Sequence, residues 1–106
     1  MNGFWTAKFN TPIGTGFGVA FFSDAEVFGG DSGYTYIGKY ERSGDNIVAN
    51  LRIAPYGAGV PSVFGPGNQA FDLKITGTVQ GNQMAGNGSA SHALGVSFQV
   101  SLTKVK

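Results

Sequence analysis

Apolar and polar residues alternate along most of this chain, and short polar or glycine-rich turns separate the alternating segments. Because successive side chains of a strand point to opposite faces, a period of two indicates β-strands with one buried face. Residues 70–80 give the clearest case, with Phe71, Leu73, Ile75 and Val79 on one face and Asp72, Lys74, Thr76 and Thr78 on the other. The pattern predicts eight strands, at 3–9, 14–22, 25–28, 34–42, 46–54, 70–80, 83–89 and 95–104.

The alternation also predicts which face of each strand points inward. In the second strand we expect Phe17, Val19 and Phe21 inside, because they are the larger side chains, and Gly16, Gly18 and Ala20 outside. The inward faces of three other strands are Trp5, Ala7 and Phe9; Ile47, Ala49, Leu51 and Ile53; and Val96, Phe98, Val100 and Leu102. The small outward residues Gly16, Gly18 and Ala20, together with Phe22, are our candidate for a self-association face.

Eight strands in series, joined mostly by short turns, favour an all-β fold. The predicted architecture is an eight-stranded antiparallel up-and-down (lipocalin-like) β-barrel, since closure removes unpaired strand edges. A two-sheet sandwich is the alternative, but its Greek-key crossovers need more long connections than the chain has. Only 55–69 is long, and its proline and glycine content allows at most one short helical turn, near 61–64. We expect one domain, 1–106.

Composition narrows the classes of function. Charged residues make up 12% of the chain, about half of the usual share, while hydrophobic residues make up 42%. Such a sequence is not typical of disorder, and its few charges hint that part of the surface is buried in a homodimer. A net charge of +1 without a basic stripe argues against nucleic acid as a direct partner. The N-terminus does not read as a signal peptide and no apolar run is long enough for a membrane helix, so we expect a cytoplasmic protein.

Residues that could carry catalysis are few. The chain has no cysteine and one histidine, His92, in a predicted loop, so neither a thiolate site nor a histidine pair can bind a metal. Asp31 follows Gly29 and Gly30 and precedes an aromatic strand; we expect it to anchor this turn, with lining of a barrel mouth as the alternative. No set of acid, base and nucleophile is recognisable. We therefore expect no enzyme activity, no catalytic residues, no metal and no cofactor.

Aromatic side chains are the candidates for a barrel interior. An eight-stranded barrel either fills with side chains or holds one small ligand, so these rings either pack the core or line an apolar pocket. Glycines at 38, 77 and 86 would leave room for such a pocket. The candidate lining is Trp5, Phe17, Phe21, Tyr36, Tyr40, Phe71 and Phe98.

The opening triplet Gly3-Phe4-Trp5 resembles the first motif of lipocalin-like proteins. That resemblance implies that the tryptophan plugs the closed end of the barrel and packs against a basic side chain. Arg52 and Lys104 are the two candidates for this basic partner.

A second resemblance covers roughly residues 1–80. The series Gly16-x-Gly18, Gly29-Gly30-Asp31, Tyr36-x-Gly38 and Val60-Pro61-Ser62-Val63-Phe64 resembles the negative-regulator family of type III secretion. The resemblance implies a dimeric lipocalin-like barrel that binds and sequesters a transcriptional activator. It also implies a partner-binding loop after the Tyr-x-Gly strand, at positions matching an acidic four-residue motif: Arg42, Ser43, Gly44 and Asp45.

Only Asp45 keeps the acidic character of that motif, and Arg42 reverses its sign. An interface that depends on acidic residues would be weaker here or would select another partner. The resemblance therefore supports the expected fold more strongly than the expected partner. The leading hypothesis is a non-enzymatic regulatory protein that binds a protein partner. The alternative is a lipocalin-like carrier of a small hydrophobic ligand.

Overall fold

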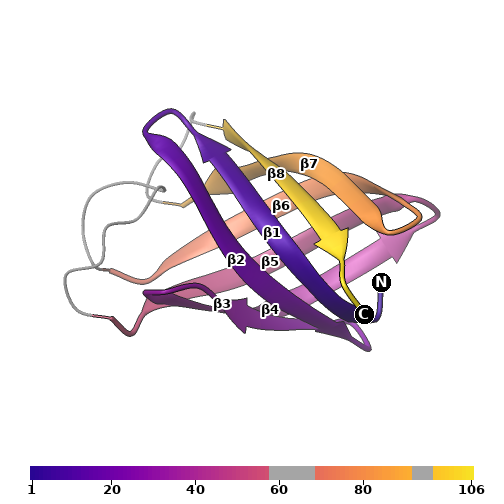
Figure 1. Cartoon of the computed structure of the whole chain (residues 1–106), viewed down its shortest axis with the longest axis horizontal. Coiled ribbons are helices and arrows are strands. Elements are labelled where there is room, and N and C mark those ends of the chain that lie inside the picture. The colour runs from indigo at the N-terminus through magenta and orange to yellow at the C-terminus, as the bar shows by residue number, and fades with distance from the viewer. Residues whose placement is uncertain (58–68, 92–96) are drawn as a thin grey trace.

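Each strand of this chain pairs with the next, and the last strand returns to pair with the first (Figure 1). The computed structural model describes residues 1–57, 69–91 and 97–106, and within them it is a closed eight-stranded antiparallel barrel without a helix. The strands are β1 (Gly3–Thr11), β2 (Gly14–Ser23), β3 (Glu26–Gly30), β4 (Tyr34–Ser43), β5 (Asn46–Pro55), β6 (Phe71–Gln80), β7 (Gln83–Ala90) and β8 (Ser97–Lys104). The predicted up-and-down barrel is confirmed. The suggested helical turn near 61–64 lies outside the described residues.

The predicted strands 14–22 and 25–28 place the turn between β2 and β3 at 23–24, and the structure places it one residue later. Asp24 and Ala25 form the turn, and both have positive φ, 48° and 74°. A two-residue hairpin with positive φ at both positions matches the right-handed twist of the flanking strands. The Asp24 N–H donates to the Asn2 side-chain oxygen at 3.1 Å, which ties the turn to the N-terminal segment.

Aromatic rings meet in the barrel interior near the two chain ends. The Phe22 ring lies between those of Trp5 and Tyr40 in edge-on contacts, with centroids 6.0 Å and 5.2 Å apart. The Trp5 indole N–H donates to the Met1 carbonyl oxygen at 3.0 Å, so its one polar atom is satisfied. Among the described residues, every fully buried side chain is apolar or a tyrosine.

The predicted faces of β2 are wrong. Phe17 and Phe21 are 68% and 40% exposed on the outer face, whereas Ala20 and Phe22 are buried. In the register of β1 with β2, Ala20 lies beside the buried Trp5, where a second large ring would not fit. Phe17 and Phe21 therefore do not line the interior. The inward face consists of Gly16, Gly18, Ala20 and Phe22, and these residues cannot form a self-association face.

Three inward-facing glycines bring strands together and do not open a pocket. A Cβ at Gly38 would collide with the carbonyl oxygen of Asn50 on β5, and one at Gly77 would lie 2.6 Å from the carbonyl oxygen of Ala85 on β7. Gly86, the register partner of Gly77, is blocked in the same way by the β6 backbone. At these three glycines the missing side chain therefore serves the close approach of neighbouring strands.

Candidate functional site

The turn between β3 and β4 is organised by one carboxylate. Asp31 Oδ1 accepts hydrogen bonds from the backbone N–H groups of Gly33 and Tyr34, both at 2.9 Å. The Asp31 N–H donates to the Tyr34 carbonyl oxygen at 3.0 Å. An aspartate that bonds the backbone two and three residues ahead stabilises a tight turn, so the predicted anchoring role of Asp31 is confirmed.

The second oxygen of the same carboxylate faces the barrel interior. Asp31 Oδ2 accepts a hydrogen bond from the Tyr36 hydroxyl at 2.5 Å, and the Tyr36 ring packs edge-on against Phe9. Gly18 makes room for this hydroxyl, because a Cβ there would lie 2.6 Å from it. Burial first, and then the hydrogen bond and charge of Asp31, raise the pKa of Tyr36 well above its usual value. Tyr36 therefore stays a proton donor to Asp31.

Tyr56, just after β5, completes this cluster from the outside. Its hydroxyl donates to the Asp31 carbonyl oxygen at 2.5 Å, and its backbone N–H donates to the Gly33 carbonyl oxygen at 2.9 Å. The ring itself is 63% exposed. It forms one wall of a surface hollow of about 560 Å³, lined by Phe17, Gly18, Val19, Gly29, Gly30, Asp31 and Tyr56.

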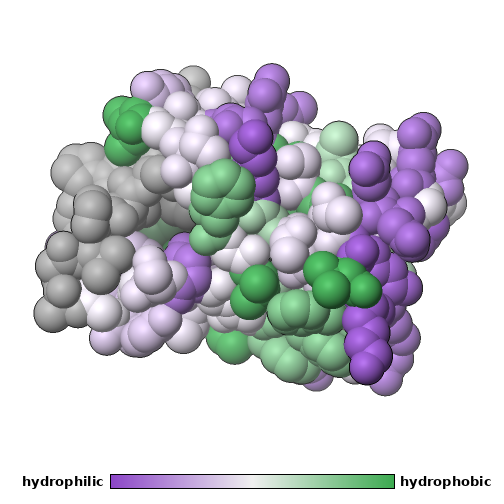
Figure 2. Space-filling view, in the orientation of Figure 1, coloured by the Kyte–Doolittle hydropathy of each residue, from purple (hydrophilic) through white to green (hydrophobic). Residues whose placement is uncertain are grey.

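A row of apolar side chains crosses the outer face of three strands. Phe21 on β2 is the register partner of Phe28 on β3, which is the register partner of Ile37 on β4. The two phenylalanine rings lie 5.3 Å apart, and the three side chains are 40%, 41% and 58% exposed. Figure 2 shows hydrophobic side chains gathered on this side of the molecule, over β2 and β3. We call Phe21, Phe28 and Ile37 the outer apolar patch.

Sequence reasoning missed this patch because it placed Phe21 inside. A signal was present: Phe21 and Phe22 are adjacent in one strand, so only one of them can point inward. Phe28 and Ile37 likewise occupy the positions of β3 and β4 that alternate with buried Val27 and Tyr36.

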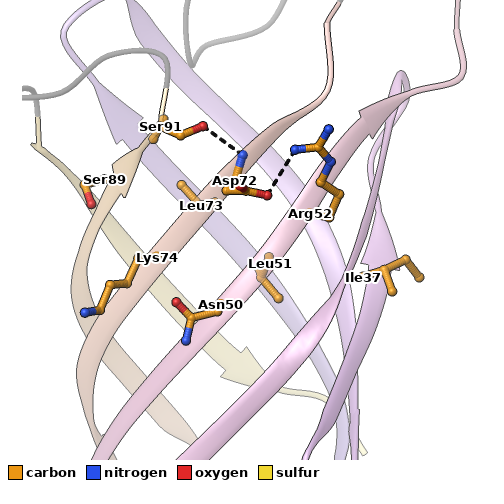
Figure 3. Close-up of a pocket in the computed structure, with 10 residues that line it drawn as sticks. Ile37, Asn50, Leu51, Arg52, Asp72, Leu73, Lys74, Ser89 and Ser91 are labelled. Carbon is orange, nitrogen blue, oxygen red and sulfur yellow. Dashed lines mark hydrogen bonds and ion pairs between the residues drawn. The ribbon is translucent and has the colours of Figure 1, made fainter.

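A groove of about 490 Å³, lined by both polar and apolar side chains and sharing Ile37 with the patch, runs over β4 to β7 (Figure 3). Here Arg52 Nη1 lies 3.1 Å from Asp72 Oδ1, and the Asp72 N–H donates to the Ser91 hydroxyl oxygen at 3.0 Å. Arg52 and Asp72 are 58% and 72% exposed, and an exposed pair of this kind contributes about 0–1 kcal/mol. The Arg52–Asp72 ion pair in this groove is therefore solvated and adds little to the stability of the fold.

Arg52 is not the basic partner expected for Trp5, because it lies on the outer face. Lys104 is the register partner of Trp5 across β1 and β8, is half-buried and shares its face. Of the two candidates, only Lys104 is positioned beside the tryptophan.

The predicted partner-binding loop is the β4–β5 hairpin, at the other end of β4 from Asp31. Arg42 Nε donates to the Gly44 carbonyl oxygen at 2.8 Å, and Arg42 Nη2 lies 3.8 Å from Asp45 Oδ1. Gly44 has a φ of 61°, which suits glycine in a tight turn. Arg42, Ser43, Gly44 and Asp45 are all exposed, and the one acidic side chain is paired within its own hairpin.

Of the predicted interior aromatics, Trp5, Tyr36, Tyr40, Phe71 and Phe98 are buried as expected. The Tyr40 hydroxyl donates to the Asn2 side-chain oxygen at 3.3 Å. Since the Tyr36 hydroxyl is bound to Asp31, these two phenol groups bond within the protein. His92 and Val96 lie outside the described residues.

The described part of the chain holds neither a metal-ligand cluster nor a membrane-spanning helix. Within 1–57, 69–91 and 97–106, no three carboxylate or histidine side chains come together as metal ligands. In those same ranges there is no helix with the length and apolar character needed to cross a membrane.

These observations define the chain as a small, closed up-and-down β-barrel with an apolar row on its outer face. In comparisons with known proteins, no family model and no curated sequence matches this chain.

Proposed function

We propose that this chain is a non-enzymatic, cytoplasmic regulatory protein that forms a homodimer and sequesters a protein partner. The observation that carries the proposal is the outer apolar patch. Full burial of a phenylalanine or isoleucine side chain contributes about 1.5–3 kcal/mol, and each patch residue has roughly half of its surface left to bury. Covering the patch is thus worth several kcal/mol in total.

A second copy of the chain suits this patch as its occupant. The patch has no charged member, so two copies can bring it together around a two-fold axis without like-charge repulsion. A stable interface needs about 800 Å² from each partner. The patch forms the centre of such an interface, and the residues around it supply the remainder.

The homodimer is tested by sedimentation velocity on three proteins. Ile37→Glu places a charge in the patch, whereas Ile13→Glu places the same charge at a comparably exposed isoleucine in the β1–β2 turn, 65% against 58% exposed. We expect the unmodified protein and Ile13→Glu to sediment as dimers and Ile37→Glu as a monomer. A dimer that persists in Ile37→Glu would refute the patch as the interface.

The partner is proposed from the resemblance to negative regulators of type III secretion, which implies a transcriptional activator. Native mass spectrometry of the protein isolated gently from its own cells tests this proposal. A dimer with a second polypeptide in fixed stoichiometry supports it. A species heavier by a few hundred daltons would instead favour the small-ligand carrier.

A further inference from the structure

An acidic and a basic side chain lie side by side at the border of the outer apolar patch. Glu26 on β3 is the register partner of Lys39 on β4, and in the next outward row Phe28 is the partner of Ile37. All four side chains are exposed on the outer face. No ion pair of Glu26 or Lys39 occurs within the part of the chain that the structure describes. Both charges are therefore available to a molecule that covers the patch.

This arrangement is self-complementary about one particular two-fold axis. When two copies of a sheet pack face to face, the axis that relates them lies between the sheets. If it runs parallel to the strands, midway between β3 and β4, it carries β3 of one copy onto β4 of the other at the same height. Glu26 of each copy then faces Lys39 of the other, and Phe28 faces Ile37 of the other. Each of these contacts forms twice.

Charge distinguishes this axis from its neighbours. An axis along β3 would place Glu26 opposite its own counterpart, and an axis along β4 would do the same with Lys39; like charges that face each other destabilise an interface. An axis between β2 and β3 would place Glu26 opposite Ser23, and one that follows the patch across the strands would place it opposite Gly30. Of these four alternatives, none pairs Glu26 with a basic group.

The groove beside the patch also receives a side chain in this arrangement. Phe21 on β2 is the register partner of Phe28, and Arg52 on β5 is that of Ile37. The axis between β3 and β4 brings β2 of one copy opposite β5 of the other, so Phe21 lies over Arg52 at the border of the groove (Figure 3). A guanidinium group is attracted to the face of an aromatic ring, so this contact is favourable as well.

We infer that two copies of this chain pack about a two-fold axis parallel to the strands, between β3 and β4, and that Glu26 and Lys39 select this orientation through two reciprocal ion pairs. The inference rests on the proposed homodimer and specifies its orientation. The ion pairs fix how the copies face each other, while the outer apolar patch supplies most of the affinity. Because the axis follows the strands, both β4–β5 hairpins lie at one end of the dimer.

Sedimentation velocity of charge variants tests the pairing. In Glu26→Lys two basic groups face each other, and in Lys39→Glu two acidic groups do. Since each clash occurs twice, each variant alone should raise the dissociation constant of the dimer about tenfold or more. In an equimolar mixture every new charge faces an opposite one, so the dissociation constant should return to within about threefold of that of the unmodified protein. A mixture that stays as weak as the single variants would overturn the inference.

Lys74→Glu is the matched control for Lys39→Glu. Lys74 is also an exposed, outward lysine, and it is separated from Lys39 by Asn50 in the same row of the sheet. Since Lys74 lies away from the axis, its substitution should leave the dissociation constant within about threefold and should not rescue Glu26→Lys. Weakening equal to that of Lys39→Glu would show that net charge, and not the facing pair, governs the dimer.

The distance between two spin labels measures the orientation directly. The chain has no cysteine, so Ser43→Cys in the β4–β5 hairpin takes one label per copy. The strand from Ile37 to Ser43 spans about 20 Å. The inferred axis keeps both labels at one end, roughly 15–25 Å apart, whereas an axis that follows the patch across the strands would separate them by about 40 Å.

These measurements separate the inference from the proposed function. If the unmodified protein sediments as a monomer, the homodimer and its inferred orientation fail together. If the protein is a dimer that Ile37→Glu disrupts, but the charge mixture gives no rescue or the labels lie about 40 Å apart, the patch is the interface and the inferred axis is wrong.

Discussion

The Tyr36 hydroxyl reaches from the barrel interior to the carboxylate of Asp31, so that one hydrogen bond links the core to the β3–β4 turn. The same carboxylate holds the turn through Gly33 and Tyr34. Packing of the core and conformation of the turn are therefore coupled at this end of the barrel.

Removing the Tyr36 hydroxyl should destabilise the fold measurably. Tyr36→Phe leaves the ring in place and deprives Asp31 Oδ2 of its donor, which should lower the free energy of unfolding by about 1–2 kcal/mol. Urea unfolding at neutral pH measures the change. Tyr40→Phe is the matched control, because its hydroxyl makes only a 3.3 Å contact with Asn2, and it should cost less. An equal loss of unfolding free energy in both variants would show that the hydrogen bond to Asp31 contributes no more to stability than the contact with Asn2.

Stability should also fall at alkaline pH because of Tyr36. Burial and Asp31 raise the pKa of Tyr36 above the ordinary value of 10.0, so the folded protein keeps a proton that the unfolded chain releases. The contribution of protonated Tyr36 to the free energy of unfolding is fully present below pH 10. It is lost as the pH rises above 10, by up to about 1.4 kcal/mol per pH unit. The difference in unfolding free energy between the unmodified protein and Tyr36→Phe should therefore narrow between pH 9 and pH 11. A difference that stays constant would mean that Tyr36 ionises normally.

Gly18 should tolerate alanine poorly, and the reason is the same hydroxyl. The new Cβ would lie 2.6 Å from the Tyr36 hydroxyl oxygen and 3.1 Å from the Gly30 carbonyl oxygen. Overpacking of this kind costs about 1–3 kcal/mol. In the Tyr36→Phe background the substitution should cost less, because the shortest of three close contacts is gone, although those with the Cε2 carbon of the ring, at 3.0 Å, and with Gly30 remain. A double-mutant cycle measured by urea unfolding tests this coupling, and strict additivity would contradict it.

The adjacent residues Phe21 and Phe22 test the orientation of β2. Phe22→Ala removes a ring packed against Trp5 and Tyr40 and should cost about 3–5 kcal/mol. Phe21→Ala, on the outer face, should cost less than about 1 kcal/mol in the monomer, measured at a protein concentration low enough to exclude self-association. The opposite ranking would restore the orientation that the sequence suggested.

Strands were predictable where their two faces differ in polarity. In β5 and β6, apolar residues alternate with polar or charged ones over most of each strand, and the buried faces are those expected. In β2 one face carries Phe17, Val19 and Phe21 and the other carries glycines, Ala20 and Phe22, so hydrophobicity could not choose between them. Which face of β2 points inward depends on Trp5 and Tyr36, which belong to other strands and occupy the barrel interior.

The candidate sites also differ in whether a local sequence pattern suffices to predict them. Asp31 bonds residues two and three positions ahead, and a local pattern suffices to predict such a contact. Tyr56 reaches Asp31 across 25 positions of the sequence, and the outer apolar patch needs the register of three strands. The shortness of β3, whose register with β2 ends at Val19 and Gly30, is likewise a property of strand pairing that no single segment encodes.

The pairing of β1 with β8 brings the two chain ends together and so permits circular permutation of the barrel. The Phe4 N–H donates to the Lys106 carbonyl oxygen at 2.7 Å, and the Val105 N–H donates back to the Phe4 carbonyl oxygen, so both chain ends lie side by side (Figure 1). A short linker could join them, and the chain could then be opened at another exposed turn. Since every strand already pairs with its neighbours in sequence, such a circular permutant would keep the same ring of strands and change only where the polypeptide starts.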